Sequence, residues 1–159
     1  MLTPDDPLYK ALTAWCQSTW ISQLVRGAPW RLASVETAHL LGLLIWFGTI
    51  LIVDLRLMGL MFESQPASDI AGAVAPFGRV ALVSQFITGP MLFLATAVKM
   101  LTSLTFIVKL ALVAIALTYH FTVHRKAVRA SGLEGNRAAA GVSLALWVGV
   151  ALAALWINA

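Results

Sequence analysis

The sequence predicts an all-α fold, in which an N-terminal amphipathic segment precedes an integral membrane four-helix bundle. Of the 159 residues, 60% are hydrophobic and only 11% are charged, whereas a soluble domain carries about 25% charged residues. Four mostly apolar segments follow one another along the chain, and each has the ~20 residues that cross the ~30 Å hydrocarbon core of a bilayer. The chain is too short for two membrane domains, so one compact bundle is expected.

Residues 1–31 are expected to lie on the outer, periplasmic face of the membrane, with one or two interfacial helices over residues 7–26. Asp6 precedes Pro7, and an aspartate can cap a helix whose first position is proline. Apolar residues then recur on one helical face until Gly27-Ala28-Pro29 ends the pattern. Three tryptophans are suited to the headgroup layer: Trp15, Trp20 and Trp30. A partner-binding arm is the alternative interpretation of this segment.

Residues 32–159 are expected to form the bundle itself. The predicted spans cover residues 32–55, 77–100, 104–123 and 138–157. The Gly89-Pro90 pair predicts a kink in the second span, because proline removes a backbone donor. Small residues recur every four positions of the fourth span and permit close contact within the bundle or with a second protomer: Gly141, Ala145, Gly149 and Ala153.

Basic residues are distributed unevenly between the two sides of the predicted bundle. The loops after the first and third spans hold Arg56, Arg79, Arg125, Lys126, Arg129 and Arg137, whereas the opposite side holds Lys10, Arg26, Arg31 and Lys99. Lysine and arginine favour the cytoplasmic side of a membrane. We therefore expect a multi-pass membrane protein with both termini outside, which is the periplasm in a Gram-negative host; the bacterial inner membrane itself is implied by the family resemblance described below. No run of basic residues indicates a nucleic-acid partner.

Ionisable residues occur inside the predicted spans, where they are costly and usually face protein or a water-filled cavity. At 100° per residue, the polar residues of the first span share one face, and so do those of the third span. Depth divides them into two clusters. The outer cluster comprises Glu36, His39 and Lys109, and the inner cluster comprises Asp54, His120 and His124.

Acid meets base in both clusters, which predicts ion pairs between the first and third spans. Glu36 is expected to pair with Lys109, and Asp54 is expected to pair with a histidine of the third span. Arg56 falls on another face, so we expect its side chain to extend to the inner headgroups. A purely structural role for these pairs is the alternative, since removing one partner of a buried pair leaves a costly charge.

Metal binding is not expected from the sequence. Cys16 is the only cysteine, which excludes an internal disulfide and a cysteine-rich metal site. The Glu36-x-x-His39 spacing resembles one helix of a di-iron carboxylate site, but it occurs once. A third ligand near His120 and His124 is missing.

Haem b is the cofactor that the histidines could hold. One haem between His39 and His120 does not fit, because the two residues differ by ~15 Å in depth at 1.5 Å per residue. His39 could instead ligate a haem together with a non-histidine partner such as Met91, or with His39 of a second protomer.

Three stretches carry a resemblance to a known family. They are PW.....ETAHLLG.....GTILIVDLRLMGL from Pro29 to Leu60, TGPMLF from Thr88 to Phe93, and F..K from Phe106 to Lys109. They resemble a family of small bacterial inner-membrane proteins that is defined only as a domain of unknown function. The resemblance implies a four-helix inner-membrane fold and no particular activity. It places Glu36, His39, Asp54, Arg56 and Lys109 within the family's recognisable motifs.

These observations favour a non-enzymatic membrane subunit or anchor of a redox or respiratory assembly, which binds haem b or lines a quinone pocket. A catalytic role is not expected, since no motif aligns a nucleophile with a base. The alternatives are a small proton- or metal-ion transporter and a purely structural membrane subunit. The expected partners are the lipid bilayer and either other membrane subunits or further copies of the same chain.

Overall fold

The computed structural model describes residues 3–132 and 134–156. Over those residues all of the regular secondary structure is helical, and short loops and turns connect the helices. The elements are α1 (Pro7–Ser18), α2 (Trp20–Arg26), α3 (Pro29–Leu57), α4 (Ala67–Met100), α5 (Leu104–Tyr119), the π-helix η1 (His120–His124), α6 (Arg125–Ala130) and α7 (Arg137–Trp156). Four helical segments are long and apolar enough to cross a membrane: Pro29–Leu57, Ala67–Met100, Leu104–Ala130 and Arg137–Trp156. The all-α, membrane-type fold that the sequence predicts is therefore confirmed.

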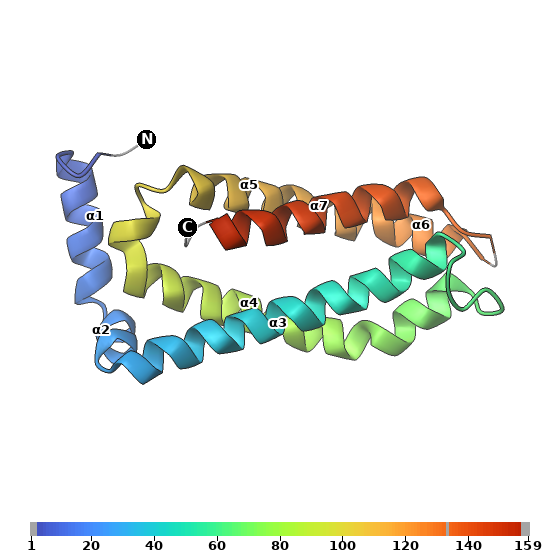
Figure 1. Ribbon diagram of the computed structural model, residues 1–159, viewed down its shortest axis with the longest axis horizontal. Coiled ribbons are helices and arrows are strands. Elements are labelled where there is room, and N and C mark those ends of the chain that lie inside the picture. Colours follow the sequence, from blue (N-terminus) through green and yellow to red (C-terminus); the bar gives the residue numbers. More distant parts are fainter. Residues whose placement is uncertain (1–2, 133, 157–159) are drawn as a thin grey trace.

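Helices α1 and α2 form the N-terminal segment, and Figure 1 shows α1 in blue standing across one end of the long helices. Tyr9 donates a hydrogen bond to the Val98 carbonyl at 2.9 Å, and Ser22 donates one to the Leu94 carbonyl at 3.1 Å. Both acceptors belong to the last turns of α4. The two helices are thus fixed to the end of α4. Three tryptophans that were expected at the headgroup layer are exposed: Trp15, Trp20 and Trp30.

Asp6 occupies the position before α1, but its carboxylate does not cap the helix as expected. The carboxylate instead accepts hydrogen bonds from the Thr3 backbone N–H at 2.7 Å and from the Thr3 hydroxyl at 3.0 Å. These bonds lower the pKa of Asp6 from its ordinary value, because they stabilise the charged form. The carboxylate is therefore used in the turn before the helix.

Helices α3 and α4 lie side by side and antiparallel (Figure 1). Helix α4 begins at Ala67, ten residues before the expected start of the second span at residue 77. Residues 67–76, which were expected in the loop, therefore belong to the helix. The backbone stays helical at the Gly89-Pro90 pair, so the kink predicted there is not found. The helix is instead kinked at Thr96, whose backbone angles are φ −122° and ψ 21°. Figure 1 shows the last turns of α4 bending away from α3 after this point.

The third span continues past its predicted end at residue 123, since η1 and α6 extend the helix to Ala130. Helix α7 packs against α5 and α3. Two apolar clusters hold the bundle together. The central cluster comprises Trp46, Ile50, Ala81, Ala116, Trp147 and Val150, and the cluster near the loops comprises Val53, Leu57, Ala67, Ile70, Val128 and Ala140.

The small residues of α7 are only partly used for packing inside the chain. Gly141 and Ala145 are exposed, and a Cβ atom added at Gly141 would have no neighbour within 4 Å. Gly149 lies against α5, where an added Cβ would sit 3.8 Å from Leu112. The first half of this ridge therefore faces outward in the single chain.

Candidate functional site

The deepest polar contact in the protein joins α3 to η1. His124 Nε2 lies 2.6 Å from Asp54 Oδ1, and the side chains are 2% and 0% exposed. An interior of low dielectric strengthens such a bond, while a single buried charge would be expensive. Of the two histidines expected to meet Asp54, His124 makes the contact.

His120 and Trp46 extend this contact toward the middle of the bundle. The rings of His120 and His124 stack with centroids 5.2 Å apart, and the His120 ring meets the edge of Trp46 at 5.1 Å. Trp46 in turn contacts Trp147 of α7 at 5.5 Å. These contacts place Trp46, His120, His124 and Asp54 in one row, which we call the inner row.

The π-helix sets the positions of both histidines. In a regular α-helix a residue and its fourth neighbour are about 40° apart around the axis, whereas the wider π-turn brings side chains four to five apart closer to one face. His120 and His124 are the first and last residues of η1. The local widening thus produces the ring stack, and such single π-turns are frequent at functional sites.

Several buried polar atoms around the inner row have no hydrogen-bond partner among the described residues. They are Trp46 Nε1, Asp54 Oδ2, His120 Nδ1, His124 Nδ1 and Ser143 Oγ. Ser143 lies one turn before Trp147 on the face of α7 that packs inward, and it is 1% exposed. Buried polar atoms are nearly always hydrogen-bonded to protein or to ordered water, so this concentration marks the inner row as a candidate site.

A second polar site lies on α3 and α4 in the predicted outer half. His39 Nδ1 is 2.8 Å from Thr88 Oγ1, and Thr88 Oγ1 donates to the Ser84 carbonyl at 2.7 Å. Because the hydroxyl proton of Thr88 is used toward Ser84, His39 Nδ1 carries the proton of the bond between them. In a neutral ring the lone pair then lies on His39 Nε2. Gln85 adds a bond of 2.6 Å to the backbone carbonyl of His39.

The expected outer cluster is only partly assembled. Lys109 lies close enough to His39 for their charges to interact, and both side chains are partly buried. Glu36, however, is exposed. Among residues 3–132 and 134–156 no ion pair joins Glu36 to Lys109, so the structure does not contain the pairing expected between them. Glu36 lies near the first turns of α3, on a face that no described helix covers.

Arg56 was expected at the inner headgroups and is instead 1% exposed. Its Nε atom donates to the Gln65 carbonyl at 2.5 Å, and an Nη atom donates to the Glu63 carbonyl at 3.4 Å. The guanidinium therefore holds the loop between α3 and α4 against the end of α3. Helical periodicity could not reveal this role, because it ignores loops that fold back over a helix end.

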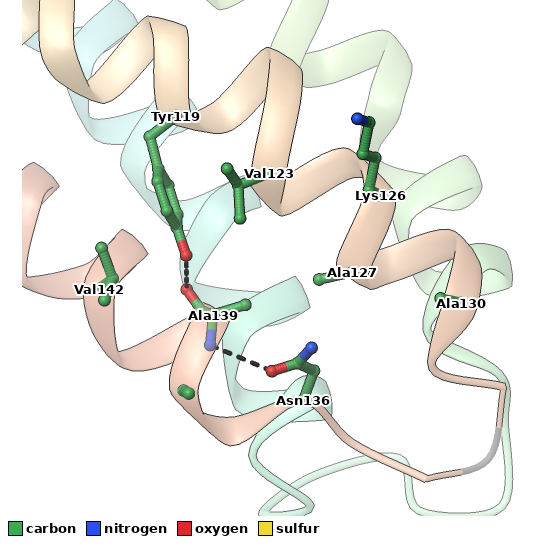
Figure 2. Close-up of a pocket in the computed structure, with 9 residues that line it drawn as sticks. Tyr119, Val123, Lys126, Ala127, Ala130, Asn136, Ala139 and Val142 are labelled. Atoms are coloured by element: carbon green, nitrogen blue, oxygen red, sulfur yellow. Dashed lines mark hydrogen bonds between the residues drawn. The ribbon is translucent and has the colours of Figure 1, made fainter.

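A groove of about 480 Å³ opens between the α5–α6 segment and α7 (Figure 2). Tyr119 donates a hydrogen bond to the Ala139 carbonyl at 3.0 Å, and the Asn136 side chain accepts one from the Ala139 N–H at 3.2 Å. The remaining walls are mainly alanine and valine, with Lys126 at the margin. The Tyr119 bond joins the third and fourth spans at the end where the loops lie, and the Asn136 bond caps the first turn of α7.

A metal centre is not supported in the part of the chain that the structure describes. No group of three or more His, Cys, Asp or Glu side chains is placed to hold a metal ion there. Asp54, His120 and His124 do lie together, but they do not form such a group. Their carboxylate and imidazoles are groups that form hydrogen bonds and transfer protons.

Comparison with known proteins gives one match. No curated protein and no solved structure matches the chain. A family model, described as a family of unknown function, matches residues 15–159, which include all four long helices and both polar sites. The chain therefore belongs to the DUF6644 family of unknown function.

Proposed function

We propose that the protein is a non-enzymatic membrane subunit or anchor of a redox assembly, and that His39 ligates a b-type haem. The observation that carries this proposal is the chain of contacts from His39 Nδ1 through Thr88 to the Ser84 carbonyl. Histidines that ligate metals typically donate their second ring N–H to an oxygen, which fixes the tautomer and the ring orientation. His39 has this arrangement and leaves Nε2 for an iron atom.

The surroundings of His39 agree with a haem. Lys109 brings a positive charge near the ring, which could neutralise a haem propionate. Met91 or His39 of another copy would provide the second ligand to the haem. A bound haem would supply one-electron transfer, while the protein would position it and set its environment.

An absorption spectrum tests the proposal. The purified full-length protein, expressed with ample haem, should show haem bands that change on reduction with dithionite. His39→Ala should remove these bands while the helical circular dichroism stays unchanged. A colourless wild-type protein, or an unchanged spectrum of His39→Ala, would contradict the proposal.

The support from Thr88 can be tested separately. Thr88→Val keeps the shape of the side chain and removes the oxygen next to His39. Loss of such a supporting bond typically lowers metal affinity 10–100-fold, so haem should dissociate more readily. Thr118→Val is the matched control, because the exposed Thr118 makes the same bond to its own helix, with Ala114, and none to a histidine.

We also propose that the protein lies in a bacterial inner membrane with both termini on the periplasmic side. The support is the basic cluster around the end of the third span, which includes Arg125, Lys126 and Arg129. A reporter fused after the last residue should be active in the periplasm. Activity confined to a reporter that works only in the cytoplasm would overturn this orientation.

A transport function is the second candidate, and the inner row favours it for protons alone. Asp54, His120 and His124 are groups that can carry a proton, and the described residues offer no set of three metal ligands. Proteoliposomes with an internal pH-sensitive dye would show proton entry above that of protein-free liposomes if the protein conducts protons.

A further inference from the structure

We propose that the inner row encloses bound water and that this water joins His120, His124 and Asp54 into a proton relay. The ligands of the site are therefore water and a proton. The proposal does not depend on a haem at His39, since the two sites use different residues.

The Asp54–His124 pair supplies the first argument. Each partner uses one polar atom in the 2.6 Å contact, while Asp54 Oδ2 and His124 Nδ1 have no partner among the residues described. Both side chains are at least 98% buried, so bulk solvent does not reach these atoms. A buried water typically makes about three hydrogen bonds to such groups. The pair thus leaves an acceptor and a ring nitrogen for water to bind.

The stack of the two imidazoles supplies the second argument. His120 Nδ1 and His124 Nδ1 both lack partners in the described chain, although their rings are 5.2 Å apart. Stacked rings cannot bond each other through their edges, so only a third molecule can connect the two nitrogens. Trp46 Nε1 is a further buried group without a partner beside the His120 ring, and Ser143 Oγ is another on α7, one turn before Trp147.

His120 is the member of the row through which the relay would open. Its side chain is partly exposed, whereas His124 and Asp54 are sealed. His120 lies about one turn farther from the basic loop than His124, toward the middle of the bundle, where its ring meets that of Trp46. The residue is partly exposed at the surface of the single chain, while its Nδ1 atom is buried.

The charged and titratable neighbours are few, and each comes from an identified element. Arg125 follows η1 and acts electrostatically on His120, and Tyr119 of α5 lies near enough to Asp54 for their charges to interact. On α7, Trp147 contacts Trp46, and Ser143 is a buried polar residue one turn earlier. On α4, the residues that pack in the central cluster are the apolar Ala81 and Leu82. The acid of the row is thus Asp54, with two histidines as its bases.

The transfer can be written without any change in total charge. Protonated His120 gives its Nδ1 proton to the bound water, which passes another proton to His124 Nδ1. His124 releases its Nε2 proton to Asp54 Oδ1 across the 2.6 Å contact. Before the step the charges are a positive His120 and a negative Asp54. After it both are neutral, with one N–H bond lost and one O–H bond formed.

Solid-state NMR of the ¹⁵N-histidine-labelled, full-length protein in bilayers tests the relay. Magnetisation should pass from water to His124 Nδ1 in the wild-type protein. His120→Phe keeps an aromatic ring for the stack and for Trp46 but removes the nitrogen, so transfer at His124 should fall several-fold. His39 should give the same signal in both samples and serves as the internal control.

Two results would overturn the proposal. One is a wild-type His124 that receives no magnetisation from water, which would mean that the row is dry. The other is an unchanged transfer at His124 in His120→Phe, which would mean that His120 is not the entry. If His120→Phe does not fold, His120→Leu removes the same nitrogen in a smaller side chain, and the wild-type measurement stands without either variant.

Discussion

Asp54 and His124 are 70 positions apart in the sequence and only 2.6 Å apart in the bundle. Their contact joins the first and third long helices at a depth where neither side chain reaches solvent. A carboxylate and an imidazole that share a hydrogen bond can be kept in an apolar interior, whereas either group without its partner is expensive there. This contact leads to the first of four predictions.

Replacing one partner of the pair should lower the free energy of unfolding by more than the hydrogen bond itself contributes. Asp54→Ala or His124→Ala should each destabilise the protein by about 3–5 kcal/mol, because the remaining partner is left buried and uncompensated. The double replacement should cost less than the sum, as expected for residues in direct contact. Thermal unfolding in detergent measures the three values. Asp69→Asn, at an exposed carboxylate of α4, is the control and should change little.

Gly42 and Gly48 of α3 offer a matched pair of glycine substitutions. A Cβ atom at Gly42 would lie 2.5 Å from Gln85 Nε2, while one at Gly48 would meet nothing within 4 Å. Gly42→Ala should displace Gln85 from the His39 carbonyl and destabilise the protein by about 1–3 kcal/mol. Gly48→Ala should be neutral or stabilising, since alanine favours helices by about 1 kcal/mol over glycine. Equal effects in unfolding experiments would argue against the close contact at Gly42.

Glu36 and Lys109 should behave as independent residues. Glu36 is exposed and makes no ion pair in the described structure, so Glu36→Gln should have a small effect. Lys109→Met should alter the surroundings of His39 instead. The losses of the two single variants should therefore add in the double variant within about 0.3–0.5 kcal/mol. A coupling well above that value in thermal unfolding would mean that the two side chains meet in the membrane.

Arg56 should matter for the loop between α3 and α4. Arg56→Met removes donors that reach the carbonyls of Glu63 and Gln65, and hydrogen bonds to charged groups typically contribute about 1.5–3 kcal/mol. The variant should therefore unfold more easily and be cleaved faster in the loop by added protease. Arg79→Met is the control, since Arg79 is exposed and its bond, of 3.4 Å, goes to Ala75 of its own helix. Equal cleavage of the two variants would contradict the role of Arg56.

The sequence predicted the fold and the inner pair because both depend on simple regularities. Long apolar segments indicate spans, and a 3.6-residue period placed Asp54 and His124 on inward faces. The same method failed for Glu36, because a face is inward only where another helix covers it. It also failed for Arg56, because the partners of this residue are carbonyls of a folded loop. The kink was placed wrongly because a proline was taken as its cause, whereas the non-helical residue is Thr96.

The contacts of Thr88, Gln85 and Trp46 were likewise not foreseen. Thr88 and Gln85 belong to the second span, and their neighbour on α3 depends on the register between two helices. Sequence periodicity contains no information about that register. The π-turn at residues 120–124 was missed for a related reason, because its sequence, HFTVH, carries no signal that distinguishes it from an ordinary helical turn.

The π-helix has a consequence for how this chain tolerates changes in length. A π-turn holds more residues than an α-turn, so removing one residue between His120 and His124 could restore a regular helix. The five residues of η1 turn through about the same angle as four residues of a regular α-helix, so such a deletion would leave α6 facing nearly the same neighbours. His120 and His124 would then be three positions apart in a regular helix, about 60° apart around its axis, and their ring stack would be lost. A one-residue deletion in this segment should thus spare the fold of the third span and remove the contact between the two histidines.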